Sequence, residues 1–179
     1  MAEKTLKKEL VYKGRIIDLY RDEVLCDNGN TSIREILHHN GGVCILGFKD
    51  GKAILVKQYR YALGKELIEL PAGKVEKGED PDLAAYREYE EETGLKPKHL
   101  IKLGSIIPTC GYSDEVIRLY LVDGYEVSNR HLDPDEEMDL LYLPLEEVEK
   151  MIENGDIVDA KSIATIYHYG RYIKKWKLQ

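Results

Sequence analysis

The stretch GKVEKGEDPDLAAYREYEEETGL, residues 73–95, predicts a helix with a marked beginning and a marked end. Asp80 suits the N-cap, Pro81 suits the first helical position, and Gly94 is typical of the residue at which a helix ends. Four glutamates occupy five positions near that C-terminal end. Because the negative pole of the helix dipole lies there, carboxylates are unfavourable in this place. The acidic cluster therefore needs a reason beyond helix formation.

A helical wheel separates an apolar side of this helix from an acidic one. At about 100° per residue, the side expected to pack against a sheet contains Leu83, Tyr86, Tyr89 and Thr93. Glu88 and Glu92, one turn apart, lie on the opposite side with Glu91 beside them. The cluster is either a solvated charged face, as most acidic runs are, or a pair of carboxylates that holds a hard divalent cation such as Mg²⁺.

The residues around the cluster favour the second interpretation. Glycines, glutamates and an arginine occur at set spacings in this window: Gly73, Glu79, Arg87, Glu88, Glu91, Glu92 and Gly94. This pattern resembles the Nudix box, the signature of hydrolases that cleave a nucleoside diphosphate linked to another group. Tyr89 is the one departure, at a position where the family usually has an aliphatic residue.

The resemblance implies a metal site. Glu88, Glu92 and the backbone carbonyl of Ala72 would bind Mg²⁺, with Mn²⁺ as the alternative. Glu91 would assist as an outer or partial ligand, and Arg87 would orient the carboxylates. The implied reaction is attack of a metal-activated water on one phosphorus of a pyrophosphate.

Beyond the box, the sequence is similar to the ADP-ribose pyrophosphatase branch of the family in the segments REILHHNGG, VKQYRYALGKELIELPAG and GYSDE. By position, Arg34 and Arg60 would contact the phosphates or the terminal ribose of the substrate. Arg60 ends a predicted strand, which suits a bidentate phosphate contact, whereas Arg34 is equally consistent with an exposed strand arginine. Glu115 and the backbone near Gly111 would lie at the substrate mouth, although an isolated loop glutamate is usually just solvated.

Two positions depart from that branch. Cys110 stands where the branch usually has a proline, with Pro108 two residues earlier. Cys110 therefore bears on the preference for ADP-ribose, or is no more than a small packing residue. The branch also uses a mobile-loop glutamate as general base, which aligns with Glu136, and Asp135 and Glu137 are its substitutes. A purely solvated acidic loop is the alternative for each of these three residues.

The elements expected around the helix are mainly strands. Apolar runs bounded by turn residues predict them between residues 10 and 40 and at GGVCILGF, AILVKQYRY, LIELPAG, IKLGSIIP, VIRLYLV and LLYLP, with KDGK as a hairpin turn. Two further helices are expected at LEEVEKMIEN and AKSIATIYHYGRYIKKW. Strands in runs with few helices between them predict an α+β fold. The resemblance makes this an α/β/α sandwich, with a mixed sheet between helices.

We expect residues 1–40 to form an N-terminal antiparallel β appendage and residues 41–179 to form the Nudix hydrolase domain. In the branch that the sequence resembles, the N-terminal segment commonly exchanges between subunits and completes the nucleoside pocket of the partner. The resemblance therefore implies a homodimer with exchanged N-terminal segments. The alternative is an edge hairpin that covers its own core.

Composition narrows the classes of partner. A formal net charge of −7 argues against a general nucleic-acid binder, because phosphate contacts need a basic face. No apolar run has the length of a membrane span, and the charged N-terminus lacks an apolar signal core. The three cysteines lack a Cys-x-x-Cys pair, which favours a reducing compartment. We therefore expect a cytoplasmic protein that binds neither nucleic acid nor membranes, and the resemblance implies a nucleoside diphosphate sugar as its substrate.

Three hypotheses follow for the function. The first is Mg²⁺-dependent hydrolysis of ADP-ribose, or of a related nucleoside diphosphate sugar, to a nucleoside monophosphate and a sugar phosphate. The second keeps the chemistry and changes the substrate to GDP-mannose, a dinucleoside polyphosphate or an oxidised nucleotide. The third is a Nudix-like sensor that binds a nucleotide without cleaving it, which the complete set of box carboxylates disfavours.

Overall fold

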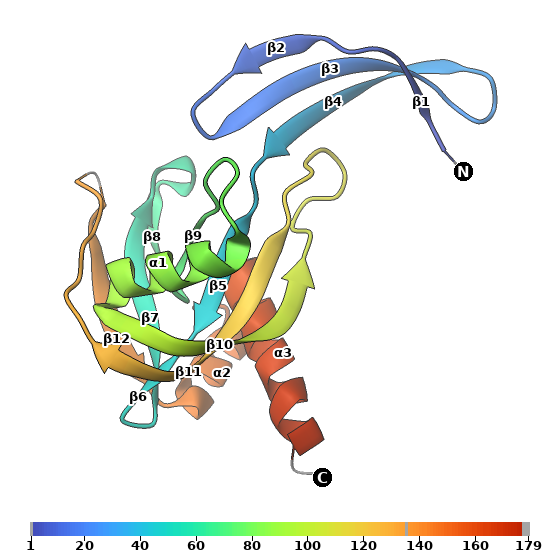
Figure 1. Ribbon diagram of the computed structural model, residues 1–179. Helices are drawn as coiled ribbons and strands as arrows, with labels where there is room; N and C mark the ends of the chain where they lie inside the picture. The colour runs from blue at the N-terminus through green and yellow to red at the C-terminus, as the bar shows by residue number, and fades with distance from the viewer. Residues whose placement is uncertain (1, 135, 177–179) are drawn as a thin grey trace. The chain divides into compact units, whose positions relative to one another are not determined.

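The structure, a computed structural model, describes residues 2–134 and 136–176 (Figure 1). The chain divides into two compact units. The first contains the residues up to Gly41 together with Ile107–Val116, and the second contains Gly42–Ile106 and the chain from Ile117 onward. The expected division at residue 41 had assigned Ile107–Val116 to the second part. Within the described residues, no helix is both long and apolar enough to span a membrane.

The first unit is built on one antiparallel sheet. Its strands are β1 (Lys4–Lys7), β2 (Leu10–Lys13), β3 (Ile17–Leu25) and β4 (Thr31–His39), and β3 pairs with each of the other three. The predicted DNGN turn joins β3 to β4, with Gly29 in the left-handed conformation that a turn of this kind favours. The loop Ile107–Val116 attaches to β4, where the Leu37 N–H donates to the Tyr112 carbonyl over 2.7 Å.

Two four-stranded sheets form the framework of the second unit. In the first sheet the order is β10 (Leu95–Ile106), β11 (Ile117–Val127), β5 (Gly42–Leu46) and β9 (Ala72–Lys74). β5 and β11 run parallel and the other pairs run antiparallel, so this sheet is mixed as predicted. In the second sheet, β7 (Lys52–Arg60) pairs with β12 (Met138–Leu143), β6 (Phe48–Lys49) and β8 (Lys65–Glu69).

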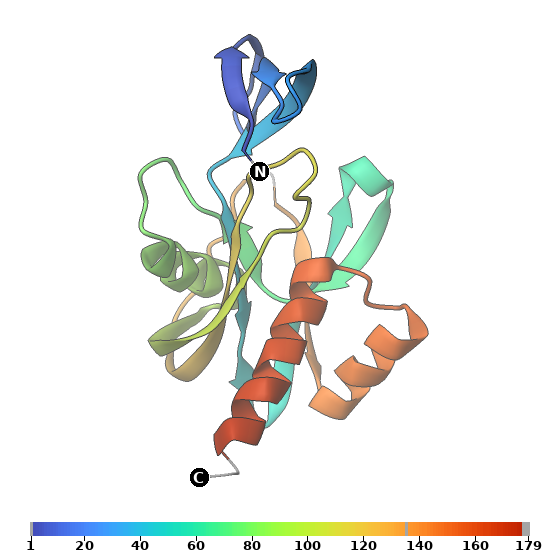
Figure 2. The ribbon, with the colours of Figure 1, turned by 90° about the vertical axis from the view of Figure 1, so that its right-hand side faces the viewer.

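Three helices cover the sheets of the second unit. Helix α1 (Pro81–Thr93) lies on one side, and α2 (Leu145–Asn154) and α3 (Ala160–Trp176) lie on the other, as the two views of Figures 1 and 2 show. The predicted boundaries of α1 are confirmed: the Asp80 side chain caps its start, and Gly94 adopts a left-handed conformation at its end. The α+β fold with a mixed sheet between helices is therefore confirmed.

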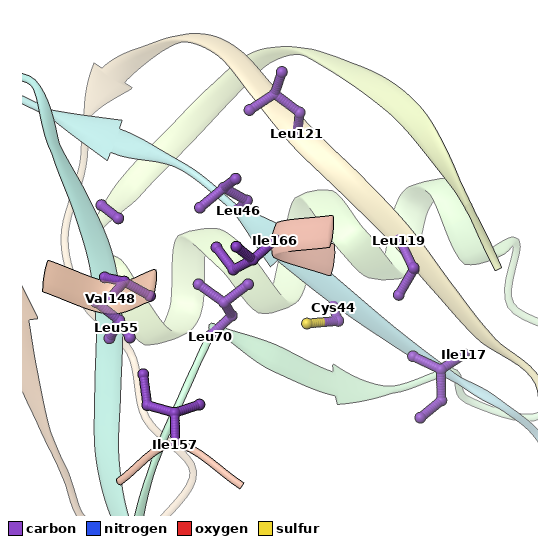
Figure 3. Packing of buried hydrophobic residues seen from close by; sticks show 11 residues of the cluster. Cys44, Leu46, Leu55, Leu70, Ile117, Leu119, Leu121, Val148, Ile157 and Ile166 are labelled. Atoms are coloured by element: carbon purple, nitrogen blue, oxygen red, sulfur yellow. The ribbon is translucent and has the colours of Figure 1, made fainter. Parts of the chain in front are cut away.

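The core has two parts because side chains alternate along a strand. Val43 and Ile45 of β5 pack with α1, whereas Cys44 and Leu46 face α2 and α3. Figure 3 shows the second group, in which Cys44, Leu46, Leu70, Leu119 and Ile166 lie close together. This packing fixes α1 on one face of the sheet and α3 on the other.

Two details differ from the sequence prediction. The KDGK hairpin joins only the two-residue strand β6 to β7, because β5 pairs instead with β9 and β11. The predicted packing face of α1 is wrong in part: Tyr89 and Thr93 are buried as expected, but Leu83 is 64% exposed while Ala84 and Ala85 are buried. Two small alanines allow the helix to approach the sheet closely, which turns the larger Leu83 outward.

Candidate active site

Glycine at position 73 allows helix α1 to approach strand β9. A Cβ atom built on Gly73 would lie 1.9 Å from the carboxyl carbon of Glu88, far inside van der Waals contact. Only a residue without a side chain fits beside that carboxylate. The first glycine of the box therefore gives Glu88 its place against the backbone next to Ala72.

Arg87 gathers the carboxylates of the box around one guanidinium. Its Nε and Nη2 donate to the two carboxylate oxygens of Glu79, each over 3.0 Å, and Nη2 also donates to the Lys74 carbonyl over 3.2 Å. Its Nη1 donates to Glu88 Oε1 at 2.9 Å and to Glu91 Oε2 at 3.0 Å. These partners raise the pKa of Arg87 further, so its charge is permanent. Arg87 thus fixes the orientation of the Glu88 and Glu91 side chains.

Glu92 is the most buried carboxylate of the helix, at 3% exposure. Its Oε2 accepts a hydrogen bond of 3.0 Å from the Ala72 N–H. Burial first of all, together with the nearby charges of Glu88 and Glu136, raises the pKa of Glu92 to about 8. Burial is also the main cause of the raised pKa of Glu88, to which Glu91 and Glu136 contribute. A cation bound beside these carboxylates would favour their charged forms.

Glu136 comes to this cluster from the segment before β12. Its side chain is exposed, and its charge acts on both Glu88 and Glu92. The Glu136 N–H donates to the Asp133 carbonyl over 2.9 Å, which turns the loop at this point. Of the two substitutes named for the general base, Glu137 is exposed and Asp135 lies outside the described residues.

The donor set fits a hard cation that keeps part of its water shell. Among the residues that the structure describes, no three carboxylate, imidazole or thiolate groups form a complete cage for a metal ion. Mg²⁺ does not need one, because it is usually bound by one or two carboxylates together with waters and substrate phosphates. Glu88 and Glu92, both desolvated and both beside Ala72, supply the two carboxylates.

Arg60 lies at the end of β7, but its guanidinium is already engaged. Its Nε donates to Glu69 Oε1 at 2.7 Å and its Nη2 donates to Glu69 Oε2 at 2.6 Å. A bidentate phosphate contact through this edge would displace Glu69, so a substrate phosphate would use the remaining Nη1. Glu69 was missed in the sequence, although a glutamate inside the apolar run LIEL is a signal of a buried charged partner.

Three predicted substrate residues belong to the first unit. A cleft of about 470 Å³ brings two of them, Arg34 and Gly111, to one wall. The cleft is lined by Leu19, Ile33, Arg34, Glu35, Leu37, Gly111 and Tyr112. The third, Glu115, lies 3.4 Å from His39 Nδ1. The guanidinium of Arg34 pairs with Glu3, its Nε donating to Glu3 Oε2 over 3.0 Å.

Comparison with known protein families agrees with the geometry of α1. The model of the NUDIX domain matches residues 38–166, which include the whole helix and its approach loop. The chain belongs to the NUDIX domain family. The resemblance found in the sequence is therefore confirmed.

Relatives of this NUDIX protein match nearly its whole length. ADP-ribose pyrophosphatase of Bacillus subtilis is 40% identical over 171 residues, covering 94% of this chain and 92% of the relative. The methanol dehydrogenase activator of Bacillus methanolicus is also 40% identical, over 93% of this chain and 91% of that protein. A solved structure described as an ADP compounds hydrolase has a TM-score of 0.88 and 20% identity, covering 98% of this chain and 96% of that one. This last similarity establishes the fold alone.

Proposed function

We propose that this NUDIX protein hydrolyses the pyrophosphate bond of ADP-ribose in a Mg²⁺-dependent reaction and releases AMP and ribose 5-phosphate. The observation that carries the proposal is the pair of carboxylates at the backbone of residues 72 and 73: Glu92 accepts from the Ala72 N–H, Glu88 lies against Gly73, and Arg87 holds Glu88. The relative from Bacillus subtilis supports ADP-ribose as the substrate, because it is similar over nearly the whole chain.

In this proposal each side chain of the box has one task. Glu88, Glu92 and the Ala72 carbonyl would hold the cation, which would supply positive charge to the pyrophosphate oxygens and to the attacking water. Arg87 keeps Glu88 and Glu91 in place because its Nη1 donates a hydrogen bond to each of them. Glu136, exposed and close enough to influence both Glu88 and Glu92, accepts a proton from the attacking water. Glu91, half exposed, assists from the rim of the site.

For the remainder of the substrate we propose Arg60, Arg34, Gly111 and Glu115 as contacts. Arg60 would reach a phosphate through Nη1. The cleft beside Arg34 and Gly111 has a volume suited to a nucleoside or a ribose. Cys110, next to Gly111, is exposed. Because the branch usually has a proline at position 110, related substrates should be tested as well.

We also propose a homodimer with exchanged N-terminal segments, acting in the cytoplasm. Across β1 to β4 only Asp22 and Val24 are buried, whereas apolar side chains including Val11 and Tyr12 are more than half exposed. A four-stranded sheet with so little core of its own requires a covering surface. A second copy of the chain would supply that surface.

Incubation with ADP-ribose and Mg²⁺, followed by separation of the products, tests the proposed reaction. We expect AMP and ribose 5-phosphate, and no turnover after chelation with EDTA. Absence of both products at high enzyme concentration would exclude ADP-ribose. Comparison of kcat/KM with GDP-mannose, a dinucleoside polyphosphate and an oxidised nucleotide ranks the remaining substrates.

Glu92→Gln separates catalysis from nucleotide sensing. The amide still offers an oxygen to the Ala72 N–H and removes a buried charge, so the fold is expected to keep its thermal stability. We expect kcat to fall by about a hundredfold or more, because one cation ligand is lost. A near-wild-type rate would overturn the metal assignment. A sensor would bind nucleotide tightly without turnover, whichever residue stands at position 92.

A further inference from the structure

We propose that Lys161 and Glu69 are positioning residues that hold Arg60 ready for the substrate phosphate. The inference builds on the proposed function by adding two residues outside the Nudix box. All three residues lie in the second unit, on β7, β8 and α3.

Glu69 is the centre of the arrangement. Its side chain is 1% exposed, and it accepts from Nε and Nη2 of Arg60 on one side and from Nζ of Lys161 on the other. Both oxygens of a buried carboxylate are thus held in place by cations. Glu69 cannot turn away from Arg60 without leaving a charge unpaired in the interior.

Lys161 is anchored by the first turn of α3. Its Nζ lies 3.0 Å from Asp159 Oδ2, and the same carboxylate oxygen accepts from Ser162 Oγ at 2.5 Å. Ser162 Oγ in turn accepts from the Leu70 N–H at 2.8 Å. The start of α3 therefore holds the chain in place at Glu69 and Leu70 through these hydrogen bonds. Glu69 and Leu70 come just before Ala72, whose carbonyl is part of the proposed cation site.

The exposed end of the network is Arg60. Its side chain is 38% exposed, compared with 14% for Lys161. Both cations also act on Glu92, because Glu92 helps to raise the pKa of Arg60 and Lys161 counteracts the rise in the pKa of Glu92. The network thus runs from a buried anchor to a partly exposed guanidinium that interacts electrostatically with Glu92.

Stability alone does not account for such a network. A buried ion pair adds little net free energy of folding, since the cost of removing both charges from water offsets their attraction. The effect of the network is instead to fix the position of the Arg60 guanidinium. A guanidinium that is already fixed loses less conformational entropy when a phosphate binds. Without Lys161, Glu69 would be neutralised by Arg60 alone, and the attraction of Arg60 for the substrate would be weakened.

The test measures substrate affinity apart from turnover. In Lys161→Met we expect KM for ADP-ribose and the Kd for ADP-ribose in EDTA to rise about tenfold, the loss of roughly one charged hydrogen bond. We expect kcat to change less than about twofold, because the carboxylate cluster is intact. Lys161→Arg keeps the cation and should restore most of the affinity. Glu69→Gln should raise KM at least as much as Lys161→Met.

A matched control lies on the same hairpin. Lys57 Nζ and Glu66 Oε2 form an exposed ion pair of 2.6 Å between β7 and β8, away from Arg60. Glu66→Gln should leave KM, kcat and the metal-free Kd unchanged. Thermal melting of every variant shows whether a loss reflects unfolding, and Glu69→Gln and Lys161→Arg keep the test decisive if Lys161→Met does not fold.

The ¹⁵Nε–H resonance of Arg60 gives a readout that needs no turnover. We expect slow hydrogen exchange in the wild type and in Lys161→Arg, and fast exchange in Lys161→Met. An unchanged KM, unchanged Kd and unchanged exchange in a folded Lys161→Met would overturn the positioning role. A wild type that binds ADP-ribose without cleaving it would instead remove the proposed reaction and leave the positioning role to be judged by Kd and exchange.

Discussion

Gly73 shows how a single missing side chain shapes the candidate site. The carboxylate of Glu88 occupies the space that a Cβ atom at position 73 would need, and Arg87 holds Glu88 from the opposite side. The carboxylate is therefore confined between a backbone and a guanidinium. Such confinement keeps a ligand in one orientation before the cation binds.

Gly73→Ala should disable the site and leave most of the fold intact. The new Cβ would force Glu88 away from the backbone, and displacement of a catalytic group by about 1 Å can cost a hundredfold in rate. We expect kcat for ADP-ribose to fall by about a hundredfold in a hydrolysis assay. The far-UV circular dichroism spectrum of the same sample shows whether the fold is intact.

Gly170→Ala is the matched control for this substitution. Nothing lies within 4 Å of a Cβ built at position 170, in the middle of α3. Alanine there should leave kcat unchanged and raise the free energy of unfolding by about 1 kcal/mol, the difference in helix propensity. A similar loss of rate in both variants would show that the effect at Gly73 is not local.

The residues of the box could be predicted from spacing, but their surroundings could not. Position in the motif identified Glu88 and Glu92, yet the helical wheel placed them opposite the packing face. They lie instead on the sheet-facing side with Ala85 and Tyr89, because the small alanines leave room there for the longer glutamate side chains. A wheel weighted by side-chain hydrophobicity cannot foresee a helix whose buried face carries its carboxylates.

At the scale of elements, the start of α1 is the best-specified part of the fold. The Asp80 carboxylate accepts from the Asp82 N–H over 2.7 Å, and Pro81 follows it in the first turn. Asp82 accepts from Lys102 Nζ at 2.7 Å and from the Tyr120 hydroxyl at 2.8 Å, which ties the helix to β10 and β11. The cap was readable in the sequence, whereas the contacts with distant strands depend on the register of the sheet.

This arrangement makes part of the stability dependent on pH. The hydrogen bond from Lys102 lowers the pKa of Asp82 below its usual value, with Tyr120 contributing. A carboxyl group with a lower pKa in the folded state adds stability above its unfolded pKa, and that stability is lost as pH falls through the folded value. Asp82→Asn should therefore lose less stability than the wild type between pH 5 and pH 3.

We expect a difference of about 0.5 kcal/mol, since the pair is partly exposed and screened. Urea unfolding at several pH values measures it. Glu126→Gln serves as the control, because Glu126 forms an exposed and longer pair with Lys98, of 3.9 Å. Parallel pH profiles for the wild type and Asp82→Asn would contradict the role given to Lys102.

At the scale of the whole molecule, the sequence predicted a β appendage but not the loop that joins it. Leu37 of β4 exchanges backbone hydrogen bonds with Tyr112 and Asp114, and His39 N–H donates to the Asp114 carboxylate over 2.9 Å. These contacts link residues about 75 positions apart, and no local pattern encodes a contact of that separation. Cys110 and Gly111 therefore belong with the first sheet.

The exposed apolar side chains of the first sheet lead to a prediction about assembly. Val11 and Tyr12 are 54% and 58% exposed on β2. In the exchanged homodimer, Val11→Asp with Tyr12→Asp should reduce the mass in solution from two copies to the 20.6 kDa of one chain. Size-exclusion chromatography with light scattering measures it, and Val127→Asp, at an exposed apolar residue of β11, should keep the dimer mass. A wild type of single-chain mass at micromolar concentration would contradict the dimer.

Exchange also predicts that two inactive chains restore each other. Glu92→Gln removes a proposed cation ligand in the second unit, and Arg34→Ala removes a proposed substrate contact in the first. If the first unit of one chain serves the second unit of its partner, a mixed dimer contains one site with both changes and one site with neither. Random mixing of equal amounts, after mild unfolding and refolding together, should therefore recover about a quarter of the wild-type activity.

Arg60→Ala mixed with Glu92→Gln is the control, because both residues lie in the second unit and a mixed dimer then has no intact site. Recovery in neither mixture would show that each chain uses its own N-terminal sheet.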